Sequence, residues 1–130
     1  MRVLLVDDHA IVRHGVCAIL SSREDIEVCG EAGDGKEALQ KAVQLKPDLV
    51  IMDITMPLLS GFDASVKIRK ALPDVPILIL SMHDSQTVRQ ACRRAGAQGY
   101  VSKAKAGEIL LRAVDLLMDG ETFFPVTESA

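Results

Sequence analysis

Three aspartates follow two short apolar runs, in positions that would let them share one site. Asp53 follows the apolar run at residues 49–52, and Asp7 and Asp8 follow the run at residues 3–6. Runs of this kind, without a polar residue, are typical of strands that are buried on both faces of a parallel sheet. Ligands bind beyond the carboxyl ends of such strands, so the three carboxylates are expected to converge there despite their distance in sequence.

Carboxylates that lie this close to one another favour a bound cation. Two of them about 4 Å apart repel by roughly 4 kcal/mol at an effective dielectric constant of 20. Mg²⁺ fits best, because it prefers oxygen ligands and is usually held by one or two carboxylates together with phosphate oxygens and water. With such a cation to screen the approach of two anions, Asp53 can act as a nucleophile toward phosphorus.

Two further apolar runs lead to polar residues that extend this pattern. The run at residues 77–80 ends on Ser81, and the segment that begins at Tyr100 leads to Lys103. A lysine supplies a positive charge for phosphoryl oxygens, and a serine hydroxyl supplies a hydrogen bond. The set of carboxylates, hydroxyl and ammonium group therefore predicts phosphoryl-transfer chemistry.

The elements that must position these residues alternate between two sequence periods. Five strands are expected, at residues 2–7, 26–31, 48–53, 76–81 and 99–102, and a segment with apolar residues at helical spacing follows each of them. Such a succession predicts an α/β fold in which helices cover both faces of a parallel sheet.

Local signals at the ends of the helices agree with this reading. Asp34 precedes Glu37, and Ser60 precedes Asp63, at the spacing of capping boxes. Gly96 and Gly120 stand where helices need a residue with a left-handed backbone in order to end.

The composition limits the class of protein. The chain has 130 residues, of which 48% are hydrophobic, and a formal net charge of −3. This size fits one domain with one core. The lysines and arginines are spread along the chain, which is against a nucleic-acid-binding surface. No apolar stretch is long enough for a signal peptide or a membrane span, so no membrane contact is expected and the cytoplasm is the expected compartment.

The cysteines and histidines do not form a recognisable metal motif. Cys17, Cys29 and Cys92 have no CxxC or Cys/His ligand spacing, and are expected to be reduced, packed thiols. The three histidines, His9, His14 and His83, lack metal-ligand spacing to one another and are expected to be solvated or partly packed.

Taken in order along the chain, the motifs resemble those of the receiver domains of two-component response regulators. Any one motif is weak, but the ordered set is highly specific and covers residues 2 to 119. The residues that carry the resemblance are Val6-Asp7-Asp8-His9, Ala32-Gly33-Asp34-Gly35, Pro47-Asp48 with Met52-Asp53, Met56-Pro57 with Gly61, Leu80-Ser81, and Ala95-Gly96-Ala97 with Lys103.

The resemblance implies a flavodoxin-like (βα)5 doubly wound sheet of strand order 2-1-3-4-5. It also implies that a histidine kinase transfers a phosphoryl group to Asp53 in a magnesium-dependent reaction. By that resemblance Asp8, Asp53 and the backbone carbonyl of Thr55 would hold the metal, with Asp7 helping through water.

The remaining roles that the resemblance implies concern the switch. Ser81 and Lys103 would contact the phosphoryl group, and Tyr100 would turn inward when Ser81 is drawn toward the phosphate. The fourth helix, with its basic stripe of Arg89, Arg93 and Arg94, moves on activation in this family. The expected output is a shift toward a homodimer or a released effector domain.

Three segments most resemble the LuxR/NarL-type branch: Asp7-Asp8-His9, Ser81-Met82-His83-Asp84 and Gly99-Tyr100-Val101. Receivers of that branch precede a helix-turn-helix domain that binds DNA and regulates transcription. Residues 1–120 are therefore expected to form the receiver, and residues 121–130 a linker stub or tail. DNA would be reached only through an effector domain that this chain does not include; a stand-alone receiver that acts as an interaction module is the alternative.

Two positions depart from the family pattern. Lys103 is followed by Ala104, where many receivers have proline, so a cis peptide is in doubt there. Met82 is bulky where many receivers have a small residue beside the hydroxyl, which leads to the hypothesis that it slows hydrolysis of the phosphoryl group.

Two other classes of protein use a similar fold. A magnesium-dependent aspartyl-phosphate phosphohydrolase would need a second acid two residues after the nucleophile, where Thr55 stands. A flavin-binding module would need a phosphate-binding loop after the first strand, where Asp8-His9-Ala10 would repel phosphate unless a metal intervened. The favoured interpretation is therefore not an enzyme but a switch whose phosphotransfer and dephosphorylation are self-catalysed.

Overall fold

The computed structural model describes residues 1–54, 60–82 and 85–125. Strands and helices alternate along this part of the chain, as the two sequence periods predict, and each strand lies within one residue of its expected position. The elements are β1 (Arg2–Val6), α1 (Ala10–Ser21), β2 (Glu27–Ala32), α2 (Gly35–Leu45), β3 (Leu49–Asp53), α3 (Gly61–Ala71), β4 (Ile77–Ser81), α4 (Gln86–Arg94), β5 (Gly99–Ser102), a short 3₁₀ turn (Lys103–Lys105) and α5 (Ala106–Met118).

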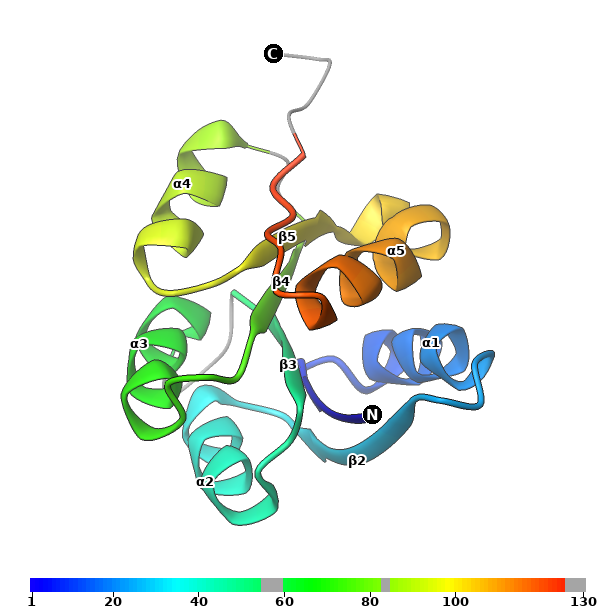
Figure 1. The fold of residues 1–130 in the computed structure, drawn as a ribbon, viewed down its shortest axis with the longest axis horizontal. Helices are drawn as coiled ribbons and strands as arrows, with labels where there is room; N and C mark the ends of the chain where they lie inside the picture. Colours follow the sequence, from blue (N-terminus) through cyan, green and yellow to red (C-terminus); the bar gives the residue numbers. More distant parts are fainter. Residues whose placement is uncertain (55–59, 83–84, 126–130) are drawn as a thin grey trace.

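The strands form one parallel sheet of order β2-β1-β3-β4-β5, which confirms the predicted flavodoxin-like fold. Figure 1 shows helices α2, α3 and α4 on one face of this sheet and α1 and α5 on the other. The chain runs outward from β1 to β2 and then returns past β1 to β3. The strand order therefore reverses between β1 and β3, and ligands of such sheets bind at the carboxyl ends of these two strands.

Alternate residues of β1, β3, β4 and β5 enter two separate cores. In β3, Leu49 and Ile51 join the core under α1 and α5, whereas Val50 and Met52 join the core under α2, α3 and α4. All four side chains are fully buried. Because both of its faces are covered, β3 carries an uninterrupted apolar run that ends on Asp53. The edge strand β2 is only partly buried and includes Glu27 and Glu31.

The helix ends follow the expected capping patterns. The Asp34 side chain accepts a hydrogen bond from the Glu37 amide at 2.8 Å, and the Ser60 hydroxyl accepts one from the Asp63 amide at 3.3 Å. Gly96 and Gly120 have φ angles of 104° and 85°. Lys46, at the end of α2, is also left-handed with φ of 49°, although no glycine or asparagine marks that position.

Several further observations bear on the sequence predictions. Within the described residues no peptide bond is cis, so the Lys103–Ala104 bond is trans. Cys17, Cys29 and Cys92 are free thiols, and burial raises the pKa of Cys92 to about 12. None of the helices described here has the length and apolar character needed to cross a lipid bilayer.

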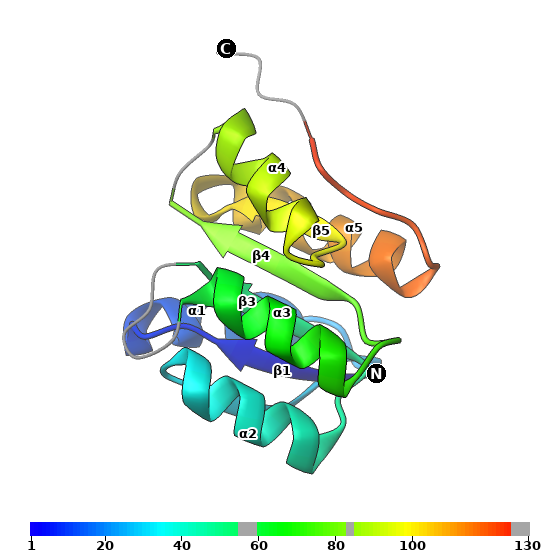
Figure 2. The same ribbon diagram turned by 90° about the vertical axis from the view of Figure 1, so that its left-hand side faces the viewer.

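Beyond α5, the chain turns back and residues 121–125 run past β5 toward α4, as Figure 2 shows in red. Phe123 forms a parallel bridge with Gly99 of β5. The segment has no sequence period, so the sequence predicted a linker stub or tail there and not a paired strand.

Candidate functional site

The polar residues predicted to do chemistry lie together at the carboxyl ends of the strands. Asp53 is the last residue of β3, and Asp7 follows the last residue of β1. The two strands are paired with Val6 opposite Met52, which places Asp7 and Asp53 side by side. Ser81 ends β4 and lies opposite Ser102, the last residue of β5.

Lys103 bridges the two buried carboxylates. Its ammonium nitrogen lies 2.7 Å from Asp7 Oδ2 and 3.3 Å from Asp53 Oδ1. Asp7 and Asp53 are 1% and 5% exposed, and the lysine side chain is 11% exposed. The structure thus brings together carboxylates and a lysine that are far apart in the sequence.

Burial and charge shift the pKa values within this group. Burial raises the pKa of Asp53; the positive charge of Lys103 opposes this shift, and the negative charge of Asp7 adds to it. Burial by itself would lower the pKa of Lys103, but its hydrogen bond to Asp7 and the charges of Asp53 and Asp7 outweigh that effect and raise it. Lys103 is therefore held in its charged form, whereas the Asp53 carboxylate is destabilised unless more positive charge is present.

The donor atoms of this edge suit a hard divalent cation. One ligand atom from each of Asp7, Asp8, His9 and Asp53 can be chosen so that all lie within 4.8 Å of one another. With Lys103 included, three carboxylates and one ammonium group leave a local charge of about −2 when His9 is neutral. Asp8 is the more exposed of the three acids, so the outer side of the cluster is open to water. Mg²⁺, which keeps several waters, fits this set of oxygen donors.

His9 belongs to the acidic cluster, which sequence reasoning missed. Its backbone N–H donates to Asp7 Oδ1 at 2.9 Å, and its ring Nδ1 lies 2.9 Å from Asp8 Oδ1. The side chain is otherwise exposed, as expected. The sequence did contain a local signal. An aspartate side chain readily accepts a hydrogen bond from the amide two residues later, in an Asx turn, and this turn brings His9 back over the Asp7 carboxylate.

The residues predicted to respond to the phosphoryl group are buried beside this edge. Ser81 is buried at the end of β4, and Tyr100 is buried in the core under α4. The Arg89 guanidinium carbon lies 5.8 Å from the centre of the Tyr100 ring. Thr55, predicted to offer a backbone carbonyl to the metal, lies outside the described residues, as do Met56, Pro57 and His83.

Comparison with known proteins gives the family of this fold and site. Residues 3–115 match the family model described as the response regulator receiver domain. The chain is 44% identical over 124 residues to the oxygen regulatory protein NreC of Staphylococcus haemolyticus, and 43% identical to that of Staphylococcus carnosus. In both cases the match covers 95% of this chain and 57% of the relative, so the chain spans little more than half the length of these relatives.

Solved structures agree with the sequence match. A LuxR-family two-component response regulator from an Aurantimonas species superimposes with a TM-score of 0.90 at 35% identity, over 94% of this chain and 87% of that one. The signal receiver domain of a response regulator named NarL from Mycobacterium tuberculosis gives a TM-score of 0.87 at 30% identity, over 92% and 97% of the two chains.

These matches confirm the resemblance predicted from the ordered motifs, including that to LuxR/NarL-type regulators, and they are against the phosphohydrolase and flavin-module alternatives. Fold, acidic edge and family match lead to one conclusion: the chain belongs to the response regulator receiver domain family of two-component systems.

Proposed function

We propose that this protein is a phosphorylation-controlled switch in which Asp53 is the phosphoacceptor. An Asp53 carboxylate oxygen would attack the phosphorus of a kinase phosphohistidine, forming an acyl phosphate as the P–N bond to the histidine breaks. The observation that carries this proposal is the pair of buried carboxylates bridged by Lys103 at the strand-order reversal of a receiver fold. Burial raises the pKa of Asp53, and ionisable groups with pKa values shifted by burial and neighbouring charges are typical of functional sites.

The same residues would hold the cation that the reaction needs. Asp8, Asp53 and the carbonyl of Thr55 are the proposed ligands of Mg²⁺, with Asp7 assisting through water. Bound Mg²⁺ would screen the negative charge of the incoming phosphoryl group and orient its oxygens. Asp7 forms a salt bridge with the Lys103 ammonium group. This carboxylate would therefore keep the lysine beside the reacting oxygen of Asp53.

Lys103, Ser81 and Tyr100 would respond to the new phosphoryl group. Because the Lys103 ammonium group lies 3.3 Å from Asp53 Oδ1, a small movement would bring it to a phosphoryl oxygen. Ser81 ends the strand next to Asp53 and would donate its hydroxyl hydrogen to another phosphoryl oxygen. Tyr100 is the proposed switch, since its ring lies between β5 and Arg89 of α4 and would follow a movement of either element.

The proposed partners follow from the family and its relatives. A sensor histidine kinase would donate the phosphoryl group in the cytoplasm, and phosphorylation would favour a homodimer. Residues 1–120 would act as the receiver, with residues 121–130 as a linker stub or tail. NreC, of which the match covers 57%, is described as an oxygen regulatory protein. We propose that DNA binding and transcription regulation would require an effector domain in addition to the receiver.

Met82 is proposed to slow the loss of the phosphoryl group. Its side chain is 76% exposed, and together with Lys103 it lines a cavity of about 270 Å³ between α1 and the start of α5. Because Met82 follows Ser81 and shares this cavity with Lys103, its bulky side chain would hinder a water that approaches the phosphoryl group from this side. Met82→Ala should shorten the lifetime of the phosphorylated protein several-fold, measured by intact mass after removal of the donor; an unchanged lifetime would reject this role.

The decisive experiment is intact-mass analysis after incubation with acetyl phosphate, with and without Mg²⁺. We expect one phosphoryl adduct that requires Mg²⁺ and is absent from Asp53→Asn. Asp48→Asn, at an acid whose side chain accepts the Arg2 amide hydrogen far from the cluster, is the matched control and should still be phosphorylated. If no adduct forms, even from a competent histidine kinase, a phosphorylation-independent interaction module becomes the better hypothesis.

A further inference from the structure

Residues 121–125, which we call the strap, extend the sheet beyond β5. The Phe123 amide donates to the Gln98 carbonyl at 2.9 Å, and the Tyr100 amide donates to the Phe123 carbonyl at 2.8 Å. These bonds lie on the side of β5 that faces away from β4, where an edge strand otherwise leaves its backbone groups open. The strap therefore occupies the edge of β5 as a short parallel strand.

The two phenylalanines of the strap hold the sheet from both faces. Phe123 packs against the core under α1 and α5, and Phe124 against the core under α2, α3 and α4. Successive residues of a strand point to opposite faces, so this arrangement is what an added strand requires. Both rings are only partly buried, and the strap contributes just these two side chains to the cores.

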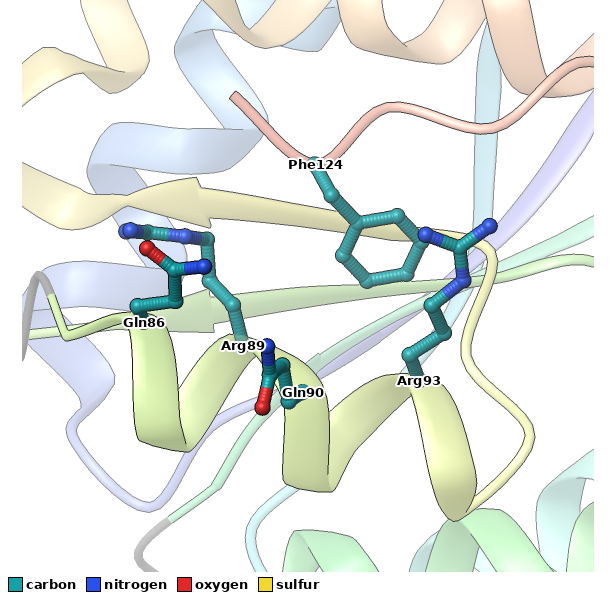
Figure 3. A pocket seen from close by; sticks show the side chains of 5 residues that line it. All are labelled: Gln86, Arg89, Gln90, Arg93 and Phe124. Carbon is teal, nitrogen blue, oxygen red and sulfur yellow. The ribbon is translucent and has the colours of Figure 1, made fainter. Parts of the chain in front are cut away.

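The contact between the strap and α4 leaves space. In Figure 3 the Phe124 side chain points from the strap toward α4, and Arg93 lies beside its ring. The Arg93 guanidinium carbon lies 5.2 Å from the centre of the ring. A cavity of about 190 Å³ remains there, lined by Gln86, Arg89, Gln90, Arg93 and Phe124. Two backbone hydrogen bonds attach the strap to β5, and a third, from the Glu121 amide to the Leu116 carbonyl, attaches its first residue to the end of α5. With so few bonds to β5 and a loosely packed ring, residues 122–125 open more easily than the central strands.

One residue connects the strap to the candidate switch. Tyr100 donates its amide hydrogen to the strap, while its ring is buried under α4 within reach of Arg89. A change in the position of Tyr100 or α4 would therefore disturb both the edge hydrogen bond and the seat of Phe124.

We propose that the strap is a releasable strand: it is bound to β5 and α4 in the unphosphorylated protein and detaches when Asp53 is phosphorylated. This inference rests on the proposed function. Release would break both hydrogen bonds to Phe123 and expose the Gln98 carbonyl and the Tyr100 amide to water.

Amide hydrogen exchange, measured by NMR, tests the proposal directly. The Tyr100 and Phe123 amides should exchange at least tenfold faster in protein kept phosphorylated with acetyl phosphate and Mg²⁺, while the amide of Ile51 in the central strand stays unchanged. Intact mass of the same sample reports the adduct. If the adduct is present and both amides remain as protected as before, the strap inference is wrong; if no adduct forms, the proposed function itself fails.

Two variants separate the strap from the phosphorylation chemistry. Phe123→Pro removes the N–H that donates to Gln98, so the Tyr100 amide should exchange fast without phosphorylation and change little on phosphorylation. Phe123→Leu keeps the N–H and an apolar side chain, and should behave as the unmodified protein does. A Tyr100 amide that stays protected in Phe123→Pro would show that the strap does not cover this edge.

Discussion

Two ion-pair clusters in this protein have similar distances but different environments. At the carboxyl end of the sheet, the Lys103 ammonium nitrogen lies 2.7 Å from Asp7, and the two side chains are only 11% and 1% exposed. Where the loop after α1 meets α5, Arg23 lies 2.7 Å from both Asp25 and Asp115, and Asp115 is 53% exposed. Distance therefore does not distinguish the two clusters, whereas burial does.

The two clusters shift the pKa of their carboxylates in opposite directions. Burial raises the pKa of Asp53, against the charge of Lys103 and with that of Asp7. The hydrogen bond from Arg23 lowers the pKa of Asp25 and, with the charge of Arg23, outweighs the opposing effect of burial. The ionised form of Asp25 is thus stabilised in the surface cluster, whereas the ionised form of Asp53 is destabilised in the buried cluster. Such local violations of good design are expected at functional sites.

Removing the lysine of the buried cluster should have the largest effect on stability. Lys103→Met leaves Asp7 and Asp53 buried without their cation, and should lower the free energy of unfolding by about 3–5 kcal/mol at pH 7 without Mg²⁺. Urea unfolding measures this loss. Lys105→Met, at an exposed lysine two residues later, is the control and should change little.

The pH dependence of that loss is a further check. The pKa of Lys103 is raised above its ordinary value of 10.5 in the folded protein. Its stabilising contribution is therefore complete below pH 10.5 and is lost as the pH rises through the higher folded value. A loss that already disappeared near neutral pH would contradict the assigned pairing.

Mg²⁺ should stabilise the buried cluster by a smaller amount. At a concentration about 100 times its Kd, a ligand that binds only the folded state adds about 2.7 kcal/mol. Thermal unfolding at constant ionic strength measures this effect. Asp8→Ala should reduce it strongly, whereas Asp74→Ala, at an exposed acid elsewhere, should leave it intact. Equal stabilisation of both variants would mean that the cation binds outside the cluster.

Neutralising Asp53 should have a smaller effect, in the opposite direction. Because its pKa is raised in the folded state, ionisation of Asp53 costs stability above the folded pKa, and no cost remains below 3.8, the ordinary value. Asp53→Asn should therefore be more stable than the unmodified protein at pH 7 without Mg²⁺. This advantage should shrink as the pH falls toward 3.8, measured by urea unfolding at each pH; a variant that is less stable at pH 7 would reverse the assignment.

Breaking the surface cluster should have the smallest effect. Arg23→Ala removes both of its ion pairs, but exposed pairs are screened by water and salt and contribute little. We expect no measurable change in Tm at physiological salt. A clear decrease there would show that the two clusters are energetically alike and that burial is not the deciding difference.

The sequence by itself determined the elements and the residues available for chemistry. Apolar runs located β1, β3 and β4 to within one residue, because strands that are buried on both faces admit few polar side chains. The edge strand β2 is an exception, since it is only partly buried and includes Glu27 and Glu31. Asp34 and Ser60 marked the starts of two helices. A capping side chain accepts a hydrogen bond from an amide only three residues later, so the sequence nearby is enough to predict it. The strand order came from the resemblance to a family, whereas the phosphoryl chemistry of Asp53 and Lys103 was already predicted from the residue types at the strand ends.

The convergence of the strand-end carboxylates was predicted, but only the tertiary structure decided which pairs form and at what distance. It placed Lys103 closer to Asp7 than to Asp53, and it seated the strap on β5, although residues 121–125 have no period that predicts a strand. Local sequence records a residue's own backbone preferences and the burial pattern of its element. Contacts between residues distant in sequence depend instead on how the elements pack, and the charged edge and the strap are both contacts of this kind.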